Sequence, residues 1–139
     1  MHITLMAHDR KKELMVQFCI AYKGILARHS ISATNTTGKL VAEATGLPIN
    51  LYLSRSQGGQ QQVGARIAYN EIDMVLFFTD PRNTDPKSDQ GLVDILHLCD
   101  LHNVPVATNL ATAEMLVLGL QRGDLDWREV VHGKRGRTF

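Results

Sequence analysis

Cysteine, tryptophan and long hydrophobic runs are scarce in this sequence. Its 139 residues include two cysteines and one tryptophan. They include no run of about eighteen apolar residues that would span a membrane, and no signal peptide. These absences argue against a disulfide framework and against a membrane-bound protein. We therefore expect a cytoplasmic protein in which Cys19 and Cys99 are buried free thiols.

Net charge is also small, because 15 Lys and Arg residues stand against 14 Asp and Glu residues, for a formal charge of +1. Such a chain has no overall attraction to nucleic acid or to a membrane. Its basic residues gather at predicted turns with no interleaved aromatic residues, which argues further against nucleic-acid binding. With 44% hydrophobic residues, the chain can bury the core of one domain. We place this domain at residues 1–123, followed by a basic tail at residues 124–139.

Short apolar segments alternate with segments of helical periodicity along the chain. The predicted strands are residues 2–7, 30–34, 49–54, 72–78 and 105–109, and the predicted helices are residues 11–28, 36–46, 61–71, 91–103 and 110–123. Strict alternation of strand and helix predicts an α/β fold with a parallel sheet covered on both faces. The nearly continuous apolar run at residues 72–78 is typical of a central strand buried on both sides.

Turns that follow the predicted strands are the places to search for chemistry, since ligands bind at the carboxyl ends of parallel strands. Hydroxyls, glycines and basic side chains dominate the first three turns, and each turn precedes a helix whose free amides favour an anion. Single residues have simpler interpretations. Thr36 and Thr37 could be helix caps, Gly58 and Gly59 could supply positive φ angles, and Asp80 could start a turn. Together the turns predict a phosphate site.

Four segments, read in order, resemble the methylglyoxal synthase family over roughly residues 2–115: "MAHDRKK", "ATNTTGKL", "LSRSQGGQQQVGARIAYNEIDMVLFFTDP" and "LCDLHNVPVATNLATAE". The resemblance implies a three-layer α/β/α, Rossmann-like domain with five parallel strands in the order 3-2-1-4-5. It also implies a homohexamer that removes phosphate from dihydroxyacetone phosphate. The same type of domain binds nucleotides as a regulatory module in carbamoyl phosphate synthetase and acts as a catalytic domain in purine synthesis, so the fold leaves the function open.

The binding half of the family pattern is largely kept. Candidate ligand-binding residues are His8, Lys12, Thr34, Thr36, Thr37, Gly38, Ser54, Arg55, Gly58, Gly59, Gln60 and Lys87. They predict a phosphorylated small molecule as the ligand, with no metal and no cofactor.

The catalytic half departs from the pattern. Where the family reads Gly-Gly-Asp, this chain has glutamine at position 60, and an amide has no usable basicity for removing a carbon-bound proton. A family histidine and a further acidic residue are also replaced. The changed positions are Gln60, Lys87 and Gln90, and the retained residues that could still act on a substrate are His8, Asp9 and Asp80.

These changes favour a non-catalytic interpretation. Arg55 and Lys87 add positive charge, and a glutamine amide can contact a ribose or base without repelling phosphate. We therefore expect a catalytically inactive homologue that senses or sequesters a phosphorylated ligand, such as a nucleotide or nucleotide-derived signal. The alternative is a methylglyoxal synthase-type lyase that uses another base, Asp9 or Asp80. A protein-docking subunit would have little reason to keep the phosphate loop. In the related synthases a C-terminal arginine reaches a neighbouring subunit's site. The resemblance therefore implies that sites are shared between subunits through the basic tail, which holds Lys134, Arg135 and Arg137.

Overall fold

A five-stranded parallel sheet forms the centre of the protein in the computed structural model, which describes residues 1–132. The strands are β1 (His2–Ala7), β2 (Ser30–Ala33), β3 (Ile49–Leu51), β4 (Met74–Phe78) and β5 (Val106–Ala107). They lie in the order β3-β2-β1-β4-β5, and all four pairings are parallel. The predicted fold class and strand order are therefore confirmed.

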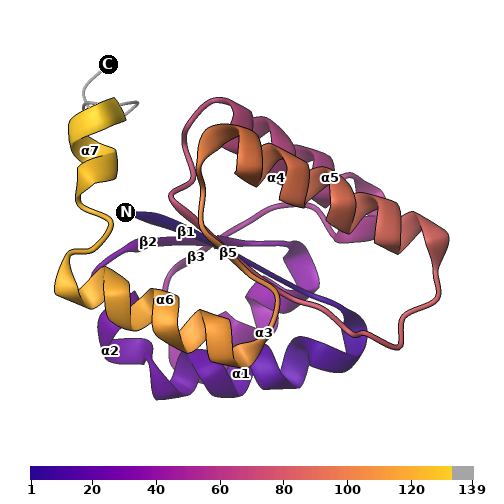
Figure 1. Ribbon diagram of the computed structural model, residues 1–139. Coiled ribbons are helices and arrows are strands. Elements are labelled where there is room, and N and C mark those ends of the chain that lie inside the picture. The colour runs from indigo at the N-terminus through magenta and orange to yellow at the C-terminus, as the bar shows by residue number, and fades with distance from the viewer. Residues whose placement is uncertain (133–139) are drawn as a thin grey trace.

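Helices cover both faces of the sheet, as Figure 1 shows. One face carries α1 (Lys12–Ala21), α2 (Lys23–Leu26), α3 (Asn35–Thr45) and α6 (Leu110–Arg122), and the other carries α4 (Gly59–Ala68) and α5 (Pro86–His102). Two short 3-10 helices, η1 (Asp9–Lys11) and η2 (Arg55–Gln57), precede α1 and α4, and α7 (Trp127–His132) follows α6. No helix among residues 1–132 is long and apolar enough to cross a membrane.

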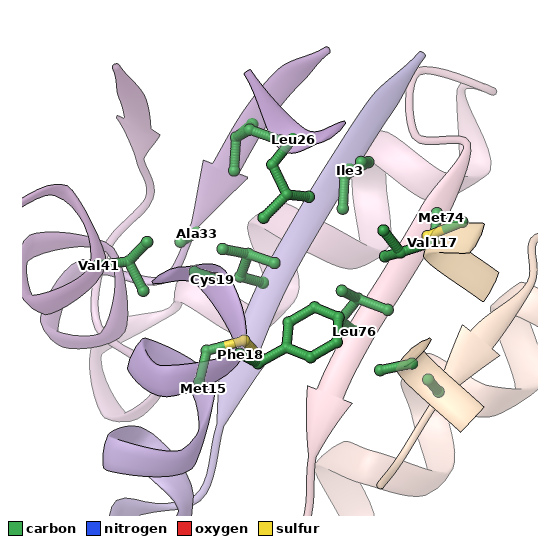
Figure 2. Close-up of a cluster of buried hydrophobic side chains, with 14 of the residues drawn as sticks. Ile3, Met15, Phe18, Cys19, Leu26, Ala33, Val41, Met74, Leu76 and Val117 are labelled. Carbon is green, nitrogen blue, oxygen red and sulfur yellow. The ribbon is translucent and has the colours of Figure 1, made fainter. Parts of the chain in front are cut away.

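Two buried clusters hold these layers together. Alternate residues of a strand point to opposite faces of the sheet. On one face, Ile3 and Leu76 pack with Phe18 of α1 (Figure 2), and on the other face Phe77 packs with Ile67 of α4. All five residues of β4 are buried, which explains the unbroken apolar run in its sequence.

Both cysteines lie inside these clusters. Cys19 belongs to the cluster on the α1 side and Cys99 to the cluster on the α4 side, and both thiols are free. Burial raises the pKa of each thiol to about 12. The prediction of buried free thiols is confirmed, and neither cysteine can serve as a thiolate nucleophile near neutral pH.

Helix α5 begins earlier than the sequence pattern predicts, at Pro86 rather than at residue 91. Asp85 caps the helix, because its carboxylate accepts a hydrogen bond from the backbone N–H of Lys87 at 3.1 Å. Proline is favoured at the first helical position that follows. Lys87 and Gln90 therefore lie in the first turns of a helix, and the prediction that they belong to a loop is wrong.

A closed polar network lies at the amino-terminal ends of the strands. Arg128 of α7 is fully buried, and its Nε donates to Asp73 at 3.1 Å. The guanidinium also donates to the carbonyl oxygens of Asn103 and Ile72, and the Asp73 carboxylate accepts the backbone N–H of His2 at 2.8 Å. The network ties α7 to the body of the protein.

Part of the predicted tail is therefore seen in contact with the domain, through α7. The boundary after residue 123 stays a prediction. The tail residues Lys134, Arg135 and Arg137 lie outside the described residues.

Candidate functional site

The carboxyl ends of the strands open into a pocket of about 870 Å³. Turns after β1, β2, β3 and β4 all contribute to its wall, as the sequence predicts for a parallel sheet. The predicted site residues that line it are His8, Asp9, Lys12, Thr34, Thr36, Thr37, Ser54, Arg55, Gln60, Asp80 and Lys87. Those that do not are Gly38, Gly58, Gly59 and Gln90. The structure thus brings most of the predicted residues to one place.

Helix α3 presents its first turn to the pocket. Thr34 is the residue before the helix and has an extended backbone, so Thr36 and Thr37 lie inside the first turn and are not its caps. Amides of a first turn have no carbonyl partner in their own helix. The buried hydroxyl of Thr37 has no hydrogen-bond partner within residues 1–132, an arrangement that costs about 1–3 kcal/mol. The N–H groups of Asn35 and Gly38 donate to the carbonyl oxygens of Leu53 and Thr34 at 3.4 and 2.8 Å, which leaves the amides of Thr36 and Thr37 beside the unpartnered hydroxyl. This arrangement indicates a site for ligand oxygens.

Glycines shape the pocket without lining it. Gly58 has a φ of 102°, which a side chain would disfavour. A Cβ on Gly59 would overlap the carbonyl oxygen of Leu53, and a Cβ on Gly38 would overlap the side chain of Leu51. Gly59 thus lets the turn after β3 fold back on its own backbone, and Gly38 lets α3 lie against β3.

Gln60 is held by helix α5. Its carboxamide lies directly over Gly91, where a Cβ would overlap the amide nitrogen. Gln90 bonds to Asp94 through its amide nitrogen at 2.9 Å, away from the pocket-lining residues. Neither amide can act as a proton-abstracting base.

His8 forms part of the pocket wall at the end of β1 and is 5% exposed. The backbone N–H of Asp80 donates to its Nδ1 at 2.7 Å, so the proton of the neutral ring lies on Nε2. Nε2 is 3.1 Å from the hydroxyl oxygen of Ser88. Burial, and then the charge of Arg55, lowers the pKa of His8. His8 is therefore a neutral N–H donor in a fixed orientation.

Two cations and one carboxylate lie side by side in the pocket wall. Lys12 Nζ lies 2.8 Å from Asp9 Oδ1, and Arg55 Nη2 lies 4.0 Å from the same oxygen. The Arg55 guanidinium sits 5.9 Å from the centre of the Phe77 ring and donates to Ser88 at 3.4 Å. The hydrogen bond and charge of Lys12 lower the pKa of Asp9, and burial lowers the pKa of Arg55. This wall attracts anions.

Two further carboxylates line the pocket, and each accepts a backbone N–H from two residues further along the chain. Asp80 accepts the N–H of Arg82 at 2.9 Å, and Asp85 accepts the N–H of Lys87 at 3.1 Å. Sequence reasoning missed Asp85 and Ser88. The pair Asp85-Pro86 carried a usable signal, since it is typical of a helix start, but nothing in the sequence pointed to Ser88.

Known proteins resemble this chain over most of its length. The family model described as MGS-like domain matches residues 14–108. The chain is 56% identical over 134 residues to a methylglyoxal synthase of Caldicellulosiruptor saccharolyticus, covering 96% of this chain and 94% of that protein. It is 48% identical to a methylglyoxal synthase of Geobacillus sp. strain WCH70, covering 98% and 96%.

A solved structure is similar as well. It is that of methylglyoxal synthase from Elizabethkingia anophelis NUHP1, with a TM-score of 0.75 and 37% identity, covering 84% of this chain and 76% of that one.

These relatives contradict the expectation of a catalytically inactive protein that senses or sequesters a nucleotide-like ligand. That expectation is wrong, because relatives at 48–56% identity over nearly the whole chain carry the name of an enzyme. It gave too much weight to the changed positions Gln60, Lys87 and Gln90. Glutamine at position 60 removes one carboxylate, whereas Asp9, Asp80 and Asp85 still line the pocket beside a neutral histidine.

Proposed function

The chain belongs to the methylglyoxal synthase family, and from that premise we propose that it is a lyase that converts dihydroxyacetone phosphate into methylglyoxal and inorganic phosphate. The observation that carries the proposal is the buried, unpartnered hydroxyl of Thr37 at the open first turn of α3. It lines the same pocket as Lys12 and His8. Such a pocket can hold a phosphate beside a group that polarises a carbonyl.

The phosphate would bind between α3 and Lys12. The amides of the first turn and the positive end of the helix dipole favour a dianion. The hydroxyls of Thr36 and Thr37 add donors, and the Lys12 ammonium adds a full charge. Since the Lys12 side chain is only 19% exposed, its charge is poorly screened by solvent.

Elimination of phosphate from a triose phosphate needs three groups. One accepts the proton on the hydroxymethyl carbon, one donates to the carbonyl oxygen as negative charge develops there, and one holds the leaving phosphate. His8 supports the second role, because its Nε2–H is fixed and neutral. A substrate carbonyl would compete with Ser88 for this donor. The phosphate loop fits the third role.

Assembly and location form part of the proposal. The family resemblance implies a homohexamer, and the free thiols of Cys19 and Cys99 fit a reducing cytoplasm. Leu40, Leu51 and Leu53, which lie on α3, on β3 and just after β3, are 41%, 44% and 49% exposed. Large apolar side chains exposed in this way favour burial against another subunit.

An activity assay with dihydroxyacetone phosphate tests the proposal. We expect the purified protein to release phosphate and methylglyoxal in equal amounts. Lys12→Ala should raise KM about 10- to 150-fold, which corresponds to about 1.5–3 kcal/mol for a hydrogen bond to a charged group. The matched control is Lys39→Ala, since Lys39 is an exposed lysine of α3 outside the pocket. No methylglyoxal from the wild type would contradict the proposal.

A further inference from the structure

We propose that Asp9 is the carboxylate that removes the carbon-bound proton in this chain. The inference rests on the proposed function, because it names the base for that reaction. It answers a question raised by position 60, where Gln60 has no usable basicity and its carboxamide packs on Gly91 of α5.

The three carboxylates that line the pocket differ in what holds them. Asp80 accepts a backbone N–H of its own loop and Asp85 accepts a backbone N–H of the first turn of α5, so their oxygens fix that loop and the start of the helix. Asp80 also positions His8 through its backbone N–H. Asp9 is bonded instead to the side chain of Lys12. Among the pocket-lining carboxylates within residues 1–132, Asp9 is thus the one paired with a cation that can also bind the substrate.

Lys12 places the base beside the phosphate. An ammonium has three donors, so Lys12 can keep its 2.8 Å bond to Asp9 and still bind a phosphate oxygen. Two acceptors on one ammonium lie about 4.5 Å apart, a separation that a three-carbon chain can span. The Asp9 carboxylate is 85% exposed and lines the pocket, so no side chain has to move away for a substrate to reach it.

Substrate binding would also activate the base. Lys12 holds the pKa of Asp9 below its usual range, and a carboxylate held in this way is a weak base. A phosphate dianion on the same ammonium offsets that positive charge, and a nearby negative charge raises the pKa of a carboxyl group. The basicity of Asp9 therefore rises when a phosphorylated substrate is in place.

In this reaction Asp9 takes up the proton and later gives it to the leaving phosphate. The bond between the hydroxymethyl carbon and hydrogen breaks, its electron pair forms the enediolate double bond, and the proton passes to the Asp9 carboxylate. The carbon–oxygen bond to phosphate then breaks, phosphate leaves with the electron pair, and Asp9 returns the proton to it. The hydroxyl proton of the enediolate ends on the terminal carbon of the released enol, which gives methylglyoxal.

The test compares Asp9→Asn with Asp100→Asn, a matched change at an exposed aspartate of α5 outside the pocket. Three quantities are measured: kcat for methylglyoxal formation, exchange of substrate carbon-bound hydrogen with deuterated water, and binding of inorganic phosphate by calorimetry. For Asp9→Asn we expect kcat and the exchange rate to fall about 10²- to 10⁴-fold. Phosphate binding should be unchanged or tighter, because the asparagine leaves Lys12 without a carboxylate partner. Asp100→Asn should match the wild type in all three.

Other outcomes overturn the inference. Turnover by Asp9→Asn within a few-fold of the wild type would exclude Asp9 as the base. Joint loss of turnover and phosphate binding would show a structural role. Exchange that survives in Asp9→Asn and disappears in Asp80→Asn would assign the role to Asp80. A wild type without activity would overturn the proposed function as well, whereas an active wild type with an active Asp9→Asn variant would overturn this inference alone.

Discussion

The two ends of the sheet bury polar groups in opposite ways. At the amino end, the Arg128 guanidinium donates to the Asp73 carboxylate and to two backbone carbonyls. At the carboxyl end, within residues 1–132, the Thr37 hydroxyl has no partner and the Lys12 ammonium bonds to the exposed Asp9 carboxylate alone. A network whose groups all bond to one another contributes to the stability of the fold and offers no hydrogen bond to a ligand. A set of groups with unused hydrogen-bonding capacity has some left for a ligand.

Removal of the guanidinium at the amino end should have the largest effect. Arg128→Ala leaves the Asp73 carboxylate buried without its cation, and breaking a buried pair in this way costs about 3–5 kcal/mol of unfolding free energy. Urea denaturation measures the loss. Phosphate affinity should be unchanged in the folded variant, since the network lies at the end of the sheet opposite the pocket.

Arg122→Ala is the matched control for this change, because Arg122 pairs with Asp124 on the surface with 65% of its side chain exposed. Exposed pairs contribute about 0–1 kcal/mol. Equal losses for Arg122→Ala and Arg128→Ala would remove the contrast between a closed network and a surface pair.

The pocket turn should tolerate an added methyl group poorly. In Gly59→Ala the new Cβ would overlap the carbonyl oxygen of Leu53, and a backbone atom cannot rotate away. We expect a loss of about 1–3 kcal/mol, the range for overpacking, together with weaker phosphate binding. Thermal unfolding and calorimetry measure the two effects.

Gly24→Ala should change the stability in the opposite direction. Gly24 lies in α2, where an added Cβ would have no other atom within 4 Å, and alanine in an open helical site stabilises by up to about 1 kcal/mol. If both glycine variants gained stability, the turn after β3 would not be a tightly packed element.

The parts of this fold that follow from short-range pattern could be predicted from the sequence. Alternation of strand and helix identified the sheet, and the hydroxyl- and glycine-rich turns identified the edge that holds the pocket. The order of the strands came from the family resemblance. What could not be predicted depends on contacts between distant residues. These are the Asp80 N–H that fixes the proton of His8 on Nε2, and the bonds of Arg128 to two separate segments, at residues 72–73 and at Asn103.

The catalytic assignment failed for a related reason. When the chain is compared with the family pattern one residue at a time, the loss of the base at position 60 is taken to mean the loss of activity. Only the folded chain shows that Asp9, Lys12 and Arg55 meet in one wall. The start of α5 was missed although its signal, Asp85 before Pro86, was present in the sequence.

The smallest expected effect gives the sharpest test of the contrast between the two ends of the sheet. It concerns whether a buried hydroxyl without a hydrogen-bond partner lowers the stability of the fold. Thr37 and Thr45 are both buried threonines of α3. Thr45 donates to the carbonyl of Val41 at 2.7 Å and accepts the N–H of Leu47 at 3.2 Å, whereas the hydroxyl of Thr37 is unpartnered within residues 1–132. Substitution by valine keeps the shape and removes the hydroxyl in each case.

Thr45→Val should lower the unfolding free energy by about 1–3 kcal/mol, because the N–H of Leu47 loses its acceptor. Thr37→Val should leave stability unchanged or raise it by about 1 kcal/mol, since it removes a buried polar group that has no partner. The same Thr37→Val variant should bind inorganic phosphate less tightly, and Thr45→Val should bind it as the wild type does. Urea denaturation and calorimetry on both variants decide the matter: if Thr37→Val lost as much stability as Thr45→Val and kept its phosphate affinity, Thr37 would belong to the packing of α3 and the first turn of that helix would no longer count as a ligand site.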